Sequence, residues 1–341
     1  MITPPGTEPF FIVGSPRSGT TLAGQILDGH SRLAVYQELN LHQTFASCLH
    51  LYGDLGDPRC RRRLLGDVVG LLRLQRADAP TVEELEALVA TPTLEGVLGA
   101  VLRHHAAAQG KPRAGEKTPL NFQYLPRLRR AFPQSPVVFL VRDPRDVALS
   151  MQRAWGTPIR EAVTTWNRAW LSLREAPPGA VHLVRYEHLV ADPEGAIRGI
   201  CAALGEDFEG GLLDPGGRVP RQFTDIGHRD LATLSGPIVA SSVGRHRDMP
   251  HADLAAIEAA CAGGLRALGY PMLTDPPPGA APTLDAPGPL RHGLDRLRYY
   301  GTSAERWRRG AYRWRLVARL QARRLGHIPR VARRGGAATP G

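Results

Sequence analysis

One stretch near the start of the chain, FFIVGSPRSGTTLAGQILDGH from Phe10 to His30, most constrains what the chain can fold into. Phe10–Val13 is a short apolar run of the strand type, and Leu22, Ile26 and Leu27 recur at helical spacing. The turn between them is rich in Gly, Ser and Pro. A strand, a glycine-flanked loop and a helix in this order predict an anion cradle, because loop N–H groups and a helix N-terminus both attract negative charge. An ordinary strand–turn–helix without a ligand is the alternative.

The spacing of the loop glycines can be compared with the P-loop of the nucleotide triphosphatases. Gly14 and Gly19 match the first part of a P-loop, which then requires Lys followed by Ser or Thr. Thr20 occupies the place of that lysine, and the cation is instead Arg17, inside the loop. The missing lysine counts against ATP or GTP as phosphoryl donor. A magnesium-dependent P-loop nucleotide kinase or hydrolase therefore stays only as an alternative.

Further apolar runs predict the fold class. Val137–Val141 is an uninterrupted apolar run, as in a central parallel strand, and Val181–Arg185 is another strand. Residues 31–38 are expected to be extended, whereas Gly115–Pro119 (GEKTP) is expected to be a polar turn. Strands that alternate with helices predict an α/β fold with a P-loop-type parallel β-sheet flanked by helices. Ligands then collect at the carboxyl ends of the strands.

A second anion site is predicted where the Val137–Val141 strand ends. Arg142 leaves the strand, and Ser150 follows eight residues later in the next helix. A guanidinium and a hydroxyl at such a corner can converge on a phosphate. The alternative is structural: Arg142 pairs only with Asp143 or Asp146, and Ser150 has no special role.

The loop from Gly14 to Thr21 and the Arg142–Ser150 segment together resemble the sulfotransferases that use 3′-phosphoadenosine-5′-phosphosulfate (PAPS). PRSGTT is similar to their 5′-phosphosulfate loop, and Arg142 with Ser150 to their 3′-phosphate motif. The resemblance runs from about Phe10 to about Pro277, and the most similar branch includes the tyrosylprotein sulfotransferases and their bacterial relatives. Three further segments follow in the family's order: Glu116–Pro119 (EKTP), Arg185–Glu187 (RYE) and Gly244–Arg247 (GRHR).

The resemblance implies a role for each site residue. Glu38 would be the general base for the acceptor hydroxyl, and Lys117 would stabilise the transferring group. Their structural alternatives are a cap or surface carboxylate and a solvated turn lysine. A histidine, among His30, His42, His104 and His105, is the alternative base. The expected 5′-phosphosulfate ligands are Arg17, Ser18, Gly19, Thr20 and Thr21, with Arg17 also counted as catalytic. The expected 3′-phosphate ligands are Arg142, Ser150, Tyr186 and Arg245, and no metal is expected.

Composition and helical pattern also divide the chain. Residues 1–273 are expected to form the sulfotransferase domain, with a helical lid insertion at about 39–110. Residues 274–290 are a Pro/Gly-rich linker, and residues 291–341 form an Arg-rich C-terminal tail. The acceptor is left open among the hydroxyls of a sugar, a lipid, a peptide or a small metabolite.

The charge of the chain is concentrated in that tail. Residues 291–341 hold 14 of the 43 Lys and Arg but only two of the 32 Asp and Glu, so the first 290 residues are nearly neutral. A body that binds duplex nucleic acid needs a basic face of its own, so nucleic acid is an unlikely partner except through the tail alone. That alternative predicts steeply salt-dependent binding.

The tail contains a predicted helix over residues 303–325 that is rich in arginine. Apolar residues at helical spacing form one stripe, whereas Leu316 and Leu320 fall on the opposite side. The helix could pack on the body with a solvated face or lie on an anionic membrane surface. The members of the stripe are Trp307, Ala311, Trp314, Ala318 and Leu325.

Targeting signals are absent from the sequence as given. No apolar run of about 18 residues predicts a membrane span, and the N-terminus lacks an apolar signal segment. The four cysteines are scattered without a C-x-x-C pair, which argues against a zinc site and for a reducing compartment. A cytoplasmic enzyme is expected, with peripheral membrane attachment through the tail as an option.

Overall fold

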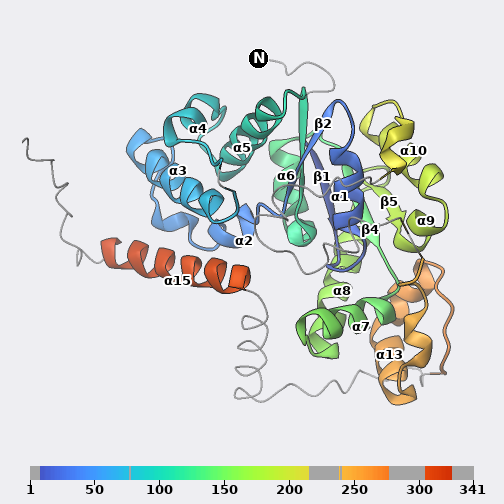
Figure 1. Ribbon diagram of the computed structural model, residues 1–341. Coiled ribbons are helices and arrows are strands. Elements are labelled where there is room, and N and C mark those ends of the chain that lie inside the picture. The colour runs from blue at the N-terminus through green and yellow to red at the C-terminus, as the bar shows by residue number, and fades with distance from the viewer. Residues whose placement is uncertain (1–7, 77, 215–237, 239, 276–303, 325–341) are drawn as a thin grey trace, which may run out of the picture.

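The computed structural model describes residues 8–76, 78–214, 238, 240–275 and 304–324. Its centre is one five-stranded sheet in the order β2-β3-β1-β4-β5, in which every neighbouring pair is parallel (Figure 1). The predicted parallel sheet flanked by helices is confirmed. The strands are β1 (Phe10–Gly14), β2 (Leu33–Gln37), β3 (Arg113–Lys117), β4 (Val137–Val141) and β5 (His182–Arg185).

The strand order creates a switch point beside β1. From β1 the chain moves to β2 and β3 on one side of the sheet, and it then crosses to β4 and β5 on the other side. Connections from β1 and β4 therefore leave in opposite directions. Open parallel sheets bind ligands in the crevice that such a divergence leaves at the carboxyl ends of the strands.

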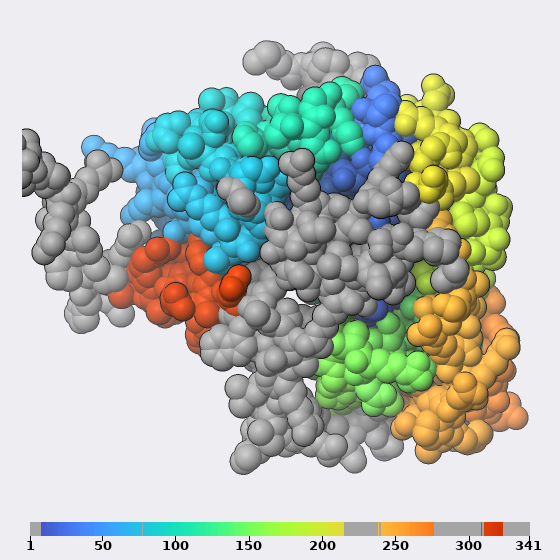
Figure 2. Space-filling model, in the orientation of Figure 1, coloured from blue at the N-terminus to red at the C-terminus, as the bar shows by residue number. Residues whose placement is uncertain are grey.

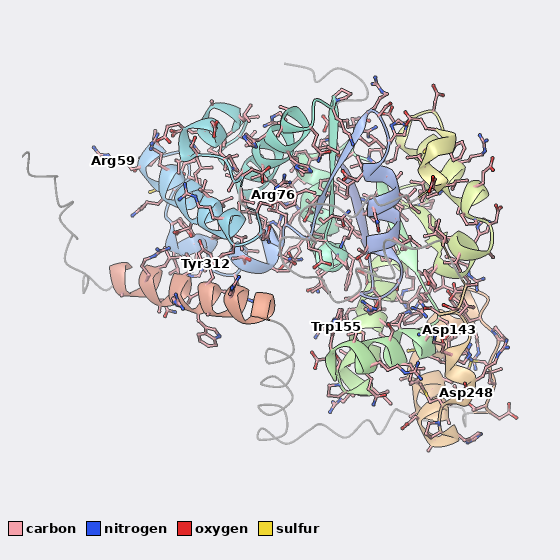
Figure 3. All side chains as sticks on the ribbon, in the orientation of Figure 1. Arg59, Arg76, Asp143, Trp155, Asp248 and Tyr312 are labelled. Carbon is pink, nitrogen blue, oxygen red and sulfur yellow. The ribbon has the colours of Figure 1, made fainter. Side chains whose placement is uncertain are left out.

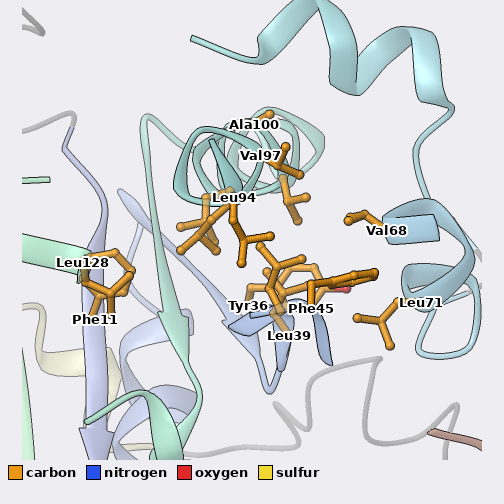
Figure 4. Packing of buried hydrophobic residues seen from close by; sticks show 14 of the residues in the cluster. Phe11, Tyr36, Leu39, Phe45, Val68, Leu71, Leu94, Val97, Ala100 and Leu128 are labelled. Carbon is orange, nitrogen blue, oxygen red and sulfur yellow. The ribbon is translucent and has the colours of Figure 1, made fainter. Parts of the chain in front are cut away.

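The sheet is covered on both faces, because alternate residues of each strand point to opposite sides. Phe11 and Phe139 belong to one core with α2 to α6, part of which Figure 4 shows, whereas Phe10 and Leu140 belong to the other core with α1, α9 and α10. Full coverage explains why β1 and β4 read as unbroken apolar runs. A third core joins α7, α8 and α13, as Val147, Trp166 and Ile257 illustrate.

The helices surround the sheet in chain order, and short 3₁₀ turns join some of them. The α-helices are α1 (Thr20–Asp28), α2 (Leu41–Phe45), α3 (Pro58–Arg73), α4 (Val82–Leu88), α5 (Leu94–Ala108), α6 (Leu125–Ala131), α7 (Pro144–Trp155), α8 (Ile159–Arg174), α9 (Tyr186–Ala191), α10 (Pro193–Leu204), α13 (His251–Ala267) and α15 (Ala304–Arg324). The 3₁₀ turns are η1 (Leu49–Leu51), η2 (Pro119–Tyr124), η3 (Gly210–Leu213) and η4 (Arg245–Asp248). No helix of the described segments is long and apolar enough to cross a bilayer.

Local sequence explains where several helices begin. In α3, α7 and α10 an Asp-Pro pair supplies an N-cap carboxylate and a proline whose missing N–H is not needed in the first turn. In α4 the N-cap, Thr81, forms a reciprocal capping box with Glu84. The three pairs are Asp57-Pro58, Asp143-Pro144 and Asp192-Pro193.

The prediction of a polar turn at Gly115–Pro119 is wrong for its first three residues. Gly115, Glu116 and Lys117 belong to β3, which lies between β2 and β1 and is buried along its whole length. Charged residues in a buried strand contradict the hydrophobic pattern on which strand prediction depends. They are tolerated because each has specific hydrogen-bond partners, nearby in the chain for Glu116 and distant for Arg113 and Lys117. For example, Arg113 donates to the carbonyl oxygens of Glu8 and Leu204.

Other expectations about the chain meet the structure only in part. Between residues 39 and 110 the chain is helical, in α2 to α5, and α15 confirms the helix expected over residues 303–325. Most of the predicted linker at 274–290 and both ends of the tail lie outside the described residues, as do residues 215–237.

Candidate active site

The carboxyl edge of the sheet carries a candidate side chain at the end of every strand. Because all the strands are parallel, these five ends lie along one edge (Figure 1). The sequence predicts ligand binding at the carboxyl ends of the strands, and the loop, Arg142 and Tyr186 all lie there. The five are the loop Ser15–Gly19 after β1, Glu38 after β2, Lys117 at the end of β3, Arg142 after β4 and Tyr186 after β5.

The loop after β1 has a backbone that only glycine permits at its two ends. Gly14 has φ 149°, and a Cβ there would lie 2.2 Å from the carbonyl oxygen of Leu140. Gly19 has φ 86° and is the N-cap of α1, yet no described side chain caps this helix and its first turn holds no acidic residue. The hydroxyl of Ser18 is buried without a hydrogen-bond partner among the described residues. Uncapped N–H groups and an unpaired hydroxyl suit a bound anion.

Arg17, in the same loop, reaches from the first cradle to the second. Its Nε donates to Ser150 Oγ at 3.0 Å, and its guanidinium lies over the ring of Trp155 at 5.5 Å. Trp155 is at the end of α7, opposite its N-cap Asp143 (Figure 3). Arg17 also has a positive φ of 69°, which is uncommon for a residue with a side chain and is often found at ligand sites. The predicted two anion sites are therefore contiguous.

Arg142, the central residue of the predicted second anion site, is 5% exposed. Its Nη1 donates to the carbonyl oxygen of Arg17 at 3.1 Å, and its guanidinium stacks on the ring of Tyr186 at 4.5 Å. Burial lowers the pKa of the guanidinium, although the charge of Asp146 opposes that shift. Arg142 Nε has no hydrogen-bond partner among the described residues. A buried cation with a spare donor is arranged to receive an anion.

The structural alternative for Arg142 holds only in part. Asp143 is occupied by Arg145, with contacts of 2.9 and 2.6 Å, so it does not pair with Arg142. Asp146 lies 3.8 Å from Arg142, at the limit of an ion pair. Its carboxylate instead accepts three hydrogen bonds, from the backbone N–H of Gly244 and from the backbone and ring of His246.

Tyr186 joins the two cradles by packing. A Cβ on Gly19 would lie only 2.5 Å from the Tyr186 ring, and the same ring stacks against the guanidinium of Arg142. Arg245 is less well integrated. It is exposed, and its Nε donates to the carbonyl oxygen of Ser241 at 2.7 Å, so the described contacts do not join its guanidinium to Arg142. Asp146 nevertheless anchors the backbone on both sides of Arg245.

Lys117 and Glu38 form an ion pair at the carboxyl edge of the sheet. Lys117 is fully buried, and its Nζ donates to Glu38 Oε1 at 2.8 Å and to Thr21 Oγ1 at 3.1 Å. Lys117 is thus not a solvated turn lysine, because it connects the anion loop to Glu38. The Glu38 side chain is 31% exposed, so a substrate can reach its carboxylate.

The backbone at Glu38 is strained and held by several hydrogen bonds. Its φ is 55°, a conformation that costs on the order of 1 kcal/mol for a residue with a side chain. Its N–H donates to Lys117 O at 2.6 Å, and its carbonyl oxygen accepts from Asn40 at 2.6 Å and Gln75 at 3.2 Å. Gln75 is buried and also accepts from Tyr36 Oη at 3.2 Å. The sequence carried no signal for Gln75, because it lies 37 residues from Glu38.

Glu116 is a second carboxyl that the sequence interpretation quoted in EKTP without giving it a role. It is 1% exposed, and its oxygens accept hydrogen bonds from Thr118 and Asn121. Burial raises the pKa of Glu116 to about 7, against the opposing effects of those hydrogen bonds and of Lys117. Thr118 Oγ1 in turn accepts the Asn40 N–H at 3.3 Å. Glu116 thus braces the turn that presents Glu38.

The titration of Glu116 predicts a pH dependence of stability. The unfolded chain releases this proton near its ordinary pKa of 4.5, whereas the folded protein keeps it to about pH 7. Folding is therefore stabilised below pH 4.5, and that contribution is lost as the pH rises to 7. Relative to Glu116→Gln, the wild type should lose about 3 kcal/mol of unfolding free energy across this window. Urea unfolding below, within and above the window measures it. Glu175→Gln, at an exposed site, is the matched control, and an unchanged pH slope in Glu116→Gln contradicts the prediction.

Three of the four candidate histidines, His30, His42 and His105, form hydrogen bonds with other parts of the chain. His30, which precedes β2, forms a hydrogen bond with the carbonyl oxygen of Asp207 at 2.9 Å. His42 forms a hydrogen bond with the Glu95 carboxylate at 3.2 Å. His105 is buried, and burial lowers its pKa to about 3, so it stays neutral at neutral pH. His104 lies on the same helix, α5. Within the described segments, no group of three or more His, Cys, Asp or Glu is placed to hold a metal ion.

Comparisons with known proteins agree on a family. Residues 9–210 match the model of the sulfotransferase family. The nodulation protein NoeE of Sinorhizobium fredii is 28% identical over 226 residues, which cover 59% of this chain and 50% of that protein. Protein-tyrosine sulfotransferase 1 of Danio rerio is 25% identical over 251 residues, which cover 70% of this chain and 61% of that protein. The chain thus spans about half of the first relative's length and under two thirds of the second's.

A solved structure shares the fold. The sulfotransferase domain of the Synechococcus PCC 7002 olefin synthase superimposes with a TM-score of 0.54 at 23% sequence identity, and the match covers 79% of this chain and 98% of that domain. The family match includes β1 to β5, and therefore all five strand ends that carry the candidate site. The chain belongs to the sulfotransferase family.

Proposed function

We propose that this protein transfers the sulfuryl group of PAPS to a hydroxyl group of an acceptor. One observation carries the proposal: Arg17 spans two adjacent anion cradles, with the Lys117–Glu38 pair beside the first. A donor with a 5′-phosphosulfate and a separate 3′-phosphate needs two such cradles. A simple phosphoryl donor has no use for the second.

Different residues are suited to the two phosphate groups of the donor. The N–H groups of Ser18 to Thr21, the Ser18 hydroxyl and the α1 N-terminus are suited to the 5′-phosphosulfate. Arg142 with its spare Nε, Ser150 and the Tyr186 ring are suited to the 3′-phosphate. Arg17 neutralises charge between the two, because its guanidinium contacts Ser150 while its loop surrounds the other anion. We keep Arg245 as an outer ligand of the second cradle.

The Lys117–Glu38 pair supplies the chemistry. Glu38 takes the proton of the acceptor hydroxyl as its oxygen bonds to sulfur, and the bond from sulfur to the 5′-phosphate oxygen breaks with its electron pair on that oxygen. Lys117 stabilises the charge on the sulfuryl and leaving oxygens, because its Nζ lies between Glu38 and Thr21 of the loop. The acceptor must approach the exposed side of Glu38, next to α2.

The donor is tested without knowing the acceptor. We expect adenosine 3′,5′-bisphosphate, the desulfated donor, to raise the melting temperature in the presence of EDTA, because binding to the folded state alone stabilises it. ATP with magnesium should raise it less. A larger, magnesium-dependent shift with ATP would instead support the P-loop kinase or hydrolase. Labelled PAPS offered with sugar, lipid, peptide and small-molecule hydroxyls then identifies the acceptor.

A further inference from the structure

Helix α15, in the Arg-rich tail, docks on the body through one specific face. Leu316 and Leu320 are 1% and 3% exposed and join the core that α3 helps to form. Tyr312 Oη donates to the carbonyl oxygen of Asp67, and Arg319 donates to the Asp67 carboxylate. Tyr312 lies between α15 and α3 (Figure 3). The two leucines that lie opposite the apolar stripe are therefore the contact with the body.

The close approach of the two helices depends on a small residue. A Cβ on Gly70 of α3 would lie 2.8 Å from Tyr312 Oη, so the helices meet where α3 has no side chain. In the space-filling view, α15 lies at the periphery of the molecule, beside the blue and cyan atoms of the segment from α2 to α5 (Figure 2). The fixed inner face determines which residues point outward.

The outward face of α15 combines an apolar centre with arginine borders. Ala311, Trp314 and Ala318 are three or four residues apart and so share one side of the helix, opposite Leu316 and Leu320. Trp314 is 72% exposed, the largest fraction among the exposed large hydrophobic residues of the described segments. Arg308 and Arg315 are exposed along one border of this face. This outward face is the apolar stripe that the sequence displayed.

We propose that the outward face of α15 binds the surface of an anionic lipid bilayer. Tryptophan favours the headgroup region, where its ring is buried while its N–H stays hydrated. The arginines at the border of the stripe can reach lipid phosphates, and each adds attraction to a negative surface. A helix with this division lies in the plane of the interface. The proposal concerns a surface formed by none of the proposed donor ligands and does not depend on the proposed donor.

A nucleic acid is the other polyanion to consider, and the arrangement of the face argues against it. Recognition of a phosphate backbone requires cations at the centre of the contact. The centre of this face holds Trp314 and two alanines, and the arginines are at its edge. Arg313 is partly engaged by the body, since it donates to Ser47 Oγ at 3.2 Å.

Vesicle co-sedimentation of the full chain tests the proposal. We expect binding to vesicles of phosphatidylcholine with phosphatidylglycerol, and little binding to phosphatidylcholine alone. Arg308→Glu/Arg315→Glu should lower the lipid partition coefficient about 100-fold. The matched control is Arg168→Glu/Arg266→Glu, which makes the same charge change at exposed sites on α8 and α13 and should bind like the wild type. Equal loss in both double variants, or equal binding to both vesicles, overturns the proposal.

Tryptophan fluorescence gives a second measurement that does not depend on charge. Anionic vesicles should shift the emission of the wild type to shorter wavelength as Trp314 enters the interface. Trp307→Phe/Trp314→Phe keeps the apolar surface and removes both tryptophans of the stripe, so it should still sediment with vesicles while losing most of that shift. A full shift in this double variant, or tighter binding to duplex DNA than to anionic vesicles, places the contact elsewhere and contradicts the proposal.

Discussion

Replacing Glu38 with glutamine is expected to lower the rate of sulfuryl transfer by about 10² to 10⁴-fold, the contribution of a positioned general base. An amide has the shape of the carboxylate and can still accept the Lys117 hydrogen bond, so the strained turn at Glu38 should persist. It cannot take the proton of the acceptor hydroxyl at neutral pH. Affinity for adenosine 3′,5′-bisphosphate should stay close to that of the wild type, because the amide oxygen keeps Lys117 in place beside Thr21 of the loop.

The experiment separates catalysis from binding. Single-turnover transfer from labelled PAPS measures the rate, and isothermal titration with the desulfated nucleotide measures the affinity. Glu175→Gln removes the same charge from an exposed position on the C-cap of α8 and should change neither. If Glu38→Gln weakens nucleotide binding as much as it slows transfer, Glu38 has a structural role. If the rate is unchanged, another group such as His42 is the base.

Replacing Arg142 with alanine is expected to weaken adenosine 3′,5′-bisphosphate by about 10- to 100-fold, since hydrogen bonds to charged groups contribute about 1.5–3 kcal/mol. Adenosine 5′-monophosphate, which lacks the 3′-phosphate, should lose much less. The selectivity follows from geometry: the spare Nε and the stacked guanidinium of Arg142 belong to the second cradle. Titration of both nucleotides into both proteins measures the difference.

A milder variant protects this test against misfolding, because Arg142 is buried and its removal leaves Asp146 with a less balanced charge. Ser150→Ala removes only a hydroxyl, and Ser150 is partly exposed on α7. It should reduce selectivity for the 3′-phosphate in the same direction, with an unchanged melting temperature. Equal weakening of both nucleotides in both variants would contradict the two-cradle assignment.

The parts of the site that could be predicted are those encoded by neighbouring residues. The loop from Gly14 to Thr21 and the Arg142 corner each follow an apolar strand directly, so strand periodicity and glycine spacing identify them. Parallel strands then place both at one edge without further information. The contact between Arg17 and Ser150 joins residues 133 positions apart, and no local pattern indicates it.

The strand β3 was missed for the opposite reason. Arg113, Glu116 and Lys117 are charged, and charge normally marks a turn or a surface. All three are buried, and two of them have partners from elsewhere in the chain, Leu204 for Arg113 and Glu38 for Lys117. Only the folded chain supplies those partners, so composition led to a polar turn where the structure has a central strand.

In the tail, too, the sequence pattern predicted the helix and its two faces, whereas packing decided which face contacts the body. The stripe containing Trp314 and Ala318 was visible in the sequence, and so were Leu316 and Leu320 opposite it. Which of the two faces meets the body was not visible. The body offers Gly70 and Asp67, which accommodate Tyr312 and Arg319 and so turn the leucines inward.

By itself the sequence determined the α/β class, the anion loop without a lysine at its end, the Arg142 corner and the family they resemble. These follow from hydrophobic period, turn chemistry and spacing, which act over a few residues. Only the tertiary structure decided that Arg17 meets Ser150 and Arg142, that buried Lys117 joins Glu38 to the loop, and that Glu116 and Gln75 hold the turn at Glu38. The physical reason is that each of these contacts joins distant strand ends or loops, and burial strengthens it only after the sheet has brought them together.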